Sequence, residues 1–191
     1  MLSFLVNRAS MALGRVAGPP ASARLPEALR PLHSLKNGFR ALDDALLVLP
    51  AESVGSLPGV RAWNAEDGWR RWFDLDARVS FFAMDVVLRQ FGVDGEGRVV
   101  RFDAVTERLE VFADDFDAWA ARMIAGGAAQ DLARAWQVMH RPLNVEERLA
   151  PSALGRGLTP MHLADAMEVL GERADVEPSI SREIEVFDVA W

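Results

Sequence analysis

The sequence contains no cysteine among its 191 residues. This absence excludes disulfide bonds, thiolate metal sites and cysteine nucleophiles, and it fits a reducing compartment. No apolar run approaches the roughly 18 residues that a membrane-spanning helix requires. We therefore expect a cytoplasmic protein that does not associate with membranes.

Positive charge is also scarce, with 21 Lys and Arg residues against 28 Asp and Glu residues and a formal net charge of −7. Lys36 is the single lysine. Because nucleic acid binding requires an excess of cations to meet the phosphates, we expect no nucleic acid partner. A modest negative charge keeps a protein soluble, and it would also attract a basic partner protein.

The N-terminal stretch carries Arg8 and Arg15 and no acid before Glu27, which gives it a weak likeness to a transit peptide. Its apolar residues instead predict an ordinary amphipathic first helix, because they recur every three to four positions. These residues are Leu2, Leu5, Ala9, Leu13 and Val16.

The segments that follow alternate between helix and strand signals. "LPEALRPLHSLKNG" (25–38) predicts a short helix that Asn37 and Gly38 end. "ALLVLP" (45–50) predicts a short buried strand, and "VRAWN" (60–64) predicts another. Four β-prone segments with tight connections then predict antiparallel pairing. They are "VSFFAMD", "RQFGVD", "RVVRFD" and "RLEVF", between residues 79 and 112.

Three helices and a last strand complete the chain. "DDFDAWAARMIAGG" (114–127) and "AAQDLARAWQVMH" (128–140) are amphipathic, and "LTPMHLADAMEVLG" (158–171) predicts a helix capped by Thr159. "EIEVFDVAW" (183–191) alternates like a strand, and we find no internal repeat. The sequence predicts an α+β fold: a single domain with a twisted, mainly antiparallel sheet flanked by helices.

We expect residues 1–127 to form the α+β core with its N-terminal helix. Residues 128–191 are expected to form a C-terminal helical extension with a terminal strand, packed on the same domain. Such a sheet, backed by helices, is interpreted as a docking platform without reacting groups.

The glycine-rich stretch from Gly92 to Gly97 resembles a ligand-binding loop only at first sight. A calcium loop starting at Asp94 would place Arg98 at a position that needs an oxygen ligand. A dinucleotide loop requires a following helix, and a P-loop requires a lysine. We interpret Asp94-Gly95 as the tip of a hairpin, with Gly97 at a bulge.

The sequence offers no catalytic, cofactor or metal motif. His33, His140 and His162 lie in separate segments without metal-binding spacing, and no nucleophile elbow is present. Paired acids on a helix point about 100° apart, so they do not converge. An enzyme remains an alternative only through a pocket assembled from distant residues such as Asp85, Arg89 and Asp103.

The six tryptophans provide the candidate binding residues. Trp119 and Trp136 fall on apolar helical stripes, which favours core packing. If the others are exposed, they predict a recognition surface, because tryptophan and arginine dominate interface hot spots. The candidate partner-binding surface therefore comprises Trp63, Trp69, Trp72, Arg70 and Arg71.

The order of these segments resembles the SUKH superfamily of SMI/KNR cell-wall-assembly-regulator type, over roughly Leu25 to Ile184. "LPEALRPLHSLKNG" is similar to its opening helix, and "FFAMD", "RQFGVD" and "GRVVRFD" are similar to successive strands. "RLEVFADDFDAWAARMI" resembles the last strand with its tryptophan-containing helix, and "AWQVMHRPLNVEERLAPS" resembles a bacterial extension.

The resemblance implies a non-catalytic binding protein without cofactors. Many bacterial members resemble immunity proteins that bind and neutralise a cognate toxin, and the negative charge would suit a basic secreted toxin. The alternative is an intracellular regulatory or interaction protein without a toxin partner.

Overall fold

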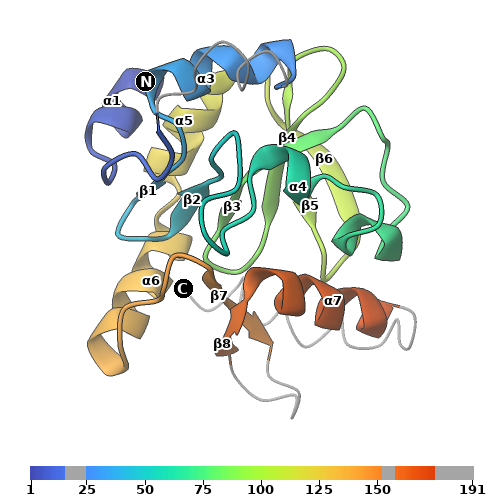
Figure 1. The fold of residues 1–191 in the computed structure, drawn as a ribbon. Coiled ribbons are helices and arrows are strands. Elements are labelled where there is room, and N and C mark those ends of the chain that lie inside the picture. The colour runs from blue at the N-terminus through green and yellow to red at the C-terminus, as the bar shows by residue number, and fades with distance from the viewer. Residues whose placement is uncertain (16–24, 152–157, 175–191) are drawn as a thin grey trace.

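A computed structural model describes residues 1–15, 25–151 and 158–174 (Figure 1). A six-stranded antiparallel sheet has its strands in chain order, and a second sheet has two antiparallel strands. The main sheet comprises β1 (Phe39–Ala41), β2 (Leu46–Val48), β3 (Ser80–Asp85), β4 (Gln90–Val93), β5 (Val99–Asp103) and β6 (Arg108–Ala113). The second comprises β7 (Glu147–Pro151) and β8 (Leu158–His162).

The helical elements surround this sheet, which confirms the predicted α+β class. The α-helices are α1 (Leu2–Asn7), α3 (Arg30–Leu35), α4 (Val60–Trp63), α5 (Phe116–Ala125), α6 (Gly127–Met139) and α7 (Leu163–Ala174). Two 3-10 helices are η1 (Glu27–Leu29) and η2 (Trp69–Trp72). None of the helices in the described part of the chain combines the length and the hydropathy needed to span a lipid bilayer.

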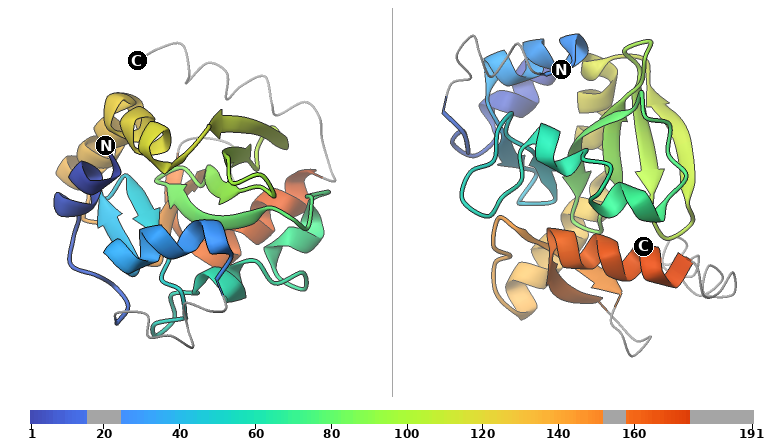
Figure 2. Two further views of the ribbon diagram at one scale, coloured as in Figure 1. Left: turned by 90° about the horizontal axis from the view of Figure 1, so that it is seen from above. Right: turned by 45° about the vertical axis from the view of Figure 1, so that its right-hand side comes forward.

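Aromatic side chains cover both faces of the main sheet. Phe82 packs edge-on against Trp119 of α5, with ring centroids 5.2 Å apart. The neighbouring Phe81 points to the opposite face, where its ring lies 5.4 Å from that of Trp69 in η2. The view from above shows α5 on one side of the strands and the α4–η2 segment on the other (Figure 2). Helices therefore cover both faces, so the sheet does not present an open face as a docking platform.

Aspartates fix the three turns between β3 and β6. Each Oδ1 atom accepts hydrogen bonds from two backbone N–H groups of its own turn: Asp85 from Val87 and Arg89, Asp94 from Glu96 and Arg98, Asp103 from Val105 and Thr106. The three aspartates are nine residues apart (94 − 85 and 103 − 94), a local repeat that the sequence prediction overlooked. Each turn then includes one residue with positive φ, namely Leu88, Gly97 and Glu107.

Several expected elements differ from the structure. The segment around Trp63 forms the short helix α4 instead of a strand, and Thr159 and Pro160 lie in β8, so the helix begins only at Leu163. The first helix ends at Asn7, because the chain then turns to run beside β1. Strands β1 and β7 were not anticipated, and the predicted strand 183–191 lies outside the described residues.

The C-terminal extension shares the core of the rest of the chain. Leu163, Met167 and Leu170 of α7 belong to the same apolar cluster as the main sheet. The backbone N–H of Leu149 in β7 donates to Val86 O, 2.8 Å away in the β3–β4 turn. In Figure 1, β7, β8 and α7 lie together below the main sheet. Residues 128–151 and 158–174 thus pack against the 1–127 core.

The β4–β5 turn provides a direct test of backbone strain. Gly95 and Gly97 both face open space, but only Gly97 has a positive φ, of 80°. We expect Gly97→Ala to lower the free energy of unfolding by about 1–2 kcal/mol, because a Cβ disfavours this backbone region. Gly95→Ala is the matched control and should change it by less than about 0.5 kcal/mol in urea denaturation. Equal effects of the two substitutions would contradict this account of the turn.

Candidate functional site

Three of the five residues of the candidate surface are buried. Trp63, Trp69 and Arg70 are 3%, 5% and 8% exposed. The indole N–H of Trp63 donates to Gln90 Oε1 at 3.0 Å, and that of Trp69 donates to Trp63 O at 2.7 Å. The two rings lie on the sheet face opposite α5, so these tryptophans form core and do not contribute to a recognition surface.

Arg70 is a structural tie between loops. Its guanidinium group donates to Val79 O at 2.7 Å, Asp76 O at 2.8 Å and Asn64 Oδ1 at 3.0 Å. Burial lowers the pKa of Arg70, although the charges of Glu66 and Asp76 act against this shift. Nη1 and Nη2 of this guanidinium group thus donate to three oxygen atoms of the protein itself. The buried group is therefore not available to a partner.

Trp72 and Arg71 lie at the surface, where η2 meets α7. Arg71 is exposed and stacks over the Trp72 ring at 4.9 Å, and its Nη2 lies 3.3 Å from Glu168 Oε1 of α7. A Cβ added to Gly171 of α7 would come within 2.4 Å of the Trp72 Cβ. The glycine therefore allows α7 to approach the half-buried tryptophan closely and to hold it in place.

Exposed carboxylates flank this pair. We define the η2–α7 surface by Arg71 and Trp72 together with the exposed acids Glu66, Asp67, Asp74 and Glu168. Glu66, Asp67 and Asp74 flank η2 in the sequence, and Glu168 of α7 pairs with Arg71. Among these six residues four acids are set against one cation, a balance that favours the approach of basic proteins.

A hollow beside α4, of about 560 Å³, is lined in part by Leu25, Arg61, Asn64 and Ser80. Its best-placed amide is already used: Asn64 Oδ1 accepts from Phe81 N at 2.8 Å, and Nδ2 donates to Val60 O and Phe81 O at 2.7 Å. The hollow therefore offers few uncommitted polar groups to orient a small molecule.

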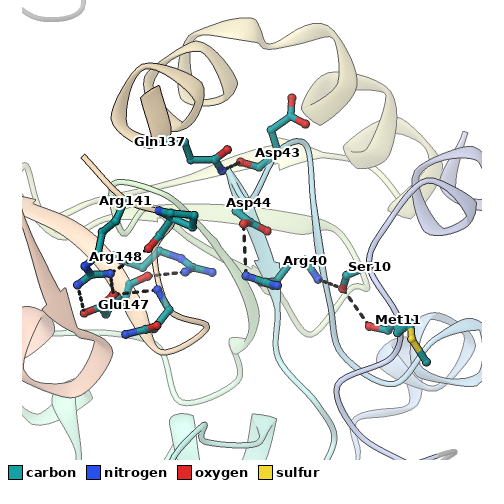
Figure 3. A network of polar contacts seen from close by, with 11 residues as sticks. Ser10, Met11, Arg40, Asp43, Asp44, Gln137, Arg141, Glu147 and Arg148 are labelled. Atoms are coloured by element: carbon teal, nitrogen blue, oxygen red, sulfur yellow. Dashed lines mark hydrogen bonds and ion pairs between the residues drawn. The ribbon is translucent and has the colours of Figure 1, made fainter. Parts of the chain in front are cut away.

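A second polar region joins the β1–β2 turn to α6 (Figure 3). Leu42, Asp43 and Asp44 all have positive φ without any glycine, a conformation that costs roughly 1–2 kcal/mol per residue. Gln130 and Arg134 of α6 donate to the Asp43 carboxylate at 2.9 and 2.6 Å, which lowers the pKa of Asp43. These contacts tie the strained turn to α6.

Arg148 of β7 is buried beside this turn. Its Nη1 donates to Glu147 O, while Nε and Nη2 have no hydrogen-bond acceptor among the described residues. Burial lowers the pKa of Arg148 to about 10, and the charges of Asp44 and Asp85 oppose that shift. Nearby carboxylates, with no direct contact, therefore favour the charged form of this buried side chain, against the effect of burial.

The alternative catalytic set does not converge on a reaction centre. Asp85 is 1% exposed and binds the backbone of its own turn, with Arg89 Nε donating to its Oδ2 at 2.6 Å. Asp103 caps the β5–β6 turn. Residues 1–15, 25–151 and 158–174 contain no group of three or more His, Asp or Glu side chains placed to hold a metal. Both aspartates act within turns, which their position at strand ends could have indicated.

No protein-family model matches this chain, and no curated protein sequence does. The candidate site is therefore assigned from the geometry of this chain alone.

Arg141 and Glu147 form a bidentate ion pair in the extension and provide a pH test. Their two N–O contacts are both 2.7 Å, and Asn144 N also donates to the carboxylate. The hydrogen bonds from Arg141 lower the pKa of Glu147 from 4.5 to about 2. Because the folded pKa is depressed, the stabilisation is complete above the unfolded value and is lost as pH falls through the folded one.

We expect Glu147→Gln to lower the free energy of unfolding by about 1 kcal/mol at pH 7. The difference from the unmodified chain should shrink as pH falls below 4.5 and vanish near 2. Glu146→Gln, which removes only an exposed contact to Ser56, is the control. Urea denaturation across this pH range measures both, and a pH-independent difference would contradict the assignment.

Proposed function

We propose that the chain is a non-catalytic protein-binding module of the bacterial immunity type, which binds and neutralises a basic secreted toxin in the cytoplasm. Its segment order, which resembles the SUKH superfamily, supports this class of function. The observation that carries the proposal is the η2–α7 surface, which combines Arg71 and Trp72 with four exposed acids, one of them paired with Arg71.

The chemistry of this surface suits a basic protein partner. Clustered carboxylates accelerate the encounter with a positively charged molecule, and this acceleration weakens as salt screens the charges. Trp72 and Arg71 are residue types that anchor interfaces, and Gly171 holds the tryptophan against α7 before any partner arrives. Preorganisation of this kind reduces the entropy lost on binding.

Co-expression with the toxin encoded beside this gene tests the function. We expect the host cells to survive with the unmodified chain and to die with a chain that cannot bind. Death of cells that carry the folded, unmodified chain would overturn the immunity proposal. Capture of several housekeeping proteins from native cells, without a toxin, would instead favour the regulatory alternative.

Charge reversal tests the surface separately. The double substitution Asp67→Lys and Asp74→Lys should slow association with the toxin at least about tenfold at low salt, because it reverses the local field. The loss should diminish as salt is raised. The matched control is the double substitution Glu27→Lys and Asp114→Lys, at exposed acids on η1 and before α5; it changes the net charge equally and should leave the association rate nearly unchanged. Equal effects of both changes would show that only net charge matters.

A further inference from the structure

The two edge strands of the main sheet, β1 and β6, differ in whether their outer backbone groups have hydrogen-bond partners. At the β1 edge, the N-terminal segment supplies backbone partners: Ser10 N donates to Arg40 O at 2.8 Å and Leu13 N donates to Gly38 O at 2.9 Å. The Arg40 N–H in turn donates to Ser10 Oγ at 2.9 Å. This edge is closed by the chain itself.

Strand β6 forms the opposite edge. Within residues 1–15, 25–151 and 158–174, no backbone hydrogen bond reaches its outer side. Its first four residues, Arg108 to Val111, are exposed, and Leu109 and Val111 retain 40% and 50% of their surface. An exposed edge strand presents unpaired N–H and C=O groups and is a template for another strand.

We propose that β6 forms an antiparallel pair with β6 of a second copy of this chain. The two-fold axis lies midway between the two Leu109 residues, and we call this the axis at Leu109. Opposite residues of an antiparallel pair must lie on the same face of the sheet. One residue of β6 must therefore lie directly opposite the same residue of the second copy, with the two-fold axis midway between them. Registers that would set a residue opposite its sequence neighbour are excluded, which leaves few to compare.

Charge selects among those registers. With the axis at Leu109, Arg108 of each copy lies opposite Glu110 of the other, so both charged residues find opposite charges. An axis at Arg108 or at Glu110 would place that residue opposite its own copy, and like charges in direct opposition destabilise a pair. An axis at Val111 would require pairing through Phe112, the extra residue where the β5–β6 register shifts, and would place Arg108 opposite Asp114 beyond the end of β6. Among axes at residues 108 to 111, the one at Leu109 therefore pairs both charged residues within the regular strand, and the segment is self-complementary there, as a closed two-fold interface requires.

The remaining side chains agree with this register. Arg101 of β5 lies directly opposite Glu110 in the sheet and forms an ion pair with it. Dimer formation would extend this pair into a row in which Arg101, Glu110 and Arg108 of the second copy alternate in charge. On the other face, Leu109 would meet Leu109 of the second copy and lie diagonal to its Val111, which removes much of the Leu109 side chain from water, while Val111 itself would lie opposite Glu107.

This inference goes beyond the proposed function, because it concerns self-association through a different element from the η2–α7 surface. The 191-residue chain has a mass of 21.1 kDa, so sedimentation equilibrium should detect a species of twice that mass as concentration rises. A chain that stays monomeric at all accessible concentrations would overturn the proposal. That result is also expected if the chain's own C-terminal segment covers the edge.

A charge swap tests the register. Glu110→Arg alone places arginines opposite one another twice, and Arg108→Glu alone does the same with glutamates. Each single substitution should raise the dissociation constant of the dimer at least about tenfold. An equimolar mixture of the two single variants should restore association, because each arginine at the interface then faces a glutamate of the other variant. Glu96→Arg is the matched control, because it also removes one exposed ion pair, with Arg98, away from β6. Failure of the mixture to associate better than either variant alone would reject this register.

The absence of cysteine permits a second, independent measurement. In the proposed register, Leu109→Cys places two thiols opposite each other at the axis, within reach of a disulfide. Mild oxidation should convert most of this variant to a covalent dimer. Val138→Cys, at an 86% exposed position on α6, controls for random collision and should remain largely monomeric. Equal cross-linking of the two variants would overturn the proposal even if a dimer forms.

Discussion

The burial of both faces of the main sheet is the constraint on which the rest of the molecule depends. Phe81 and Phe82 are neighbours on β3, and each lies in a different aromatic cluster because successive strand residues point to opposite faces. Helix α5 covers one cluster and the α4–η2 segment covers the other. With both faces of the sheet occupied, the two proposed contacts lie at the rims of the fold, on the η2–α7 surface and at the β6 edge.

The same constraint explains why Trp63 and Trp69 are buried. A loop segment that covers a sheet face must satisfy its own polar groups there, because buried donors and acceptors without partners are costly. Trp63 and Trp69 each use the indole N–H internally, and Arg70 ties three oxygen atoms of neighbouring segments. The η2 helix thus places two aromatic rings in different environments: Trp69 in the core and Trp72 at the surface.

Sequence patterns predicted the fold better than the surface. Strands β3 to β6 were predictable because each ends at an Asp or Gly in a turn, and the nine-residue spacing of Asp85, Asp94 and Asp103 could have been noticed. The burial of Trp63 and Trp69 could not be predicted, since it depends on which segment of the chain covers the sheet face opposite α5. The β1–β2 turn carries no local signal either: its three left-handed residues contain no glycine, and contacts from α6 hold them.

The C-terminal extension links these observations, because the η2–α7 surface exists only while α7 is docked. Its docking depends on apolar burial of Leu163, Met167 and Leu170, and on the β7 backbone bond from Leu149 to Val86. Arg148 adds specificity to this arrangement. The charges of Asp44 and Asp85 favour its charged form, which burial disfavours. The strained β1–β2 turn that presents Asp44 is in turn held by Gln130 and Arg134 of α6. The extension therefore contacts both the proposed binding surface, through α7, and this strained turn, through α6.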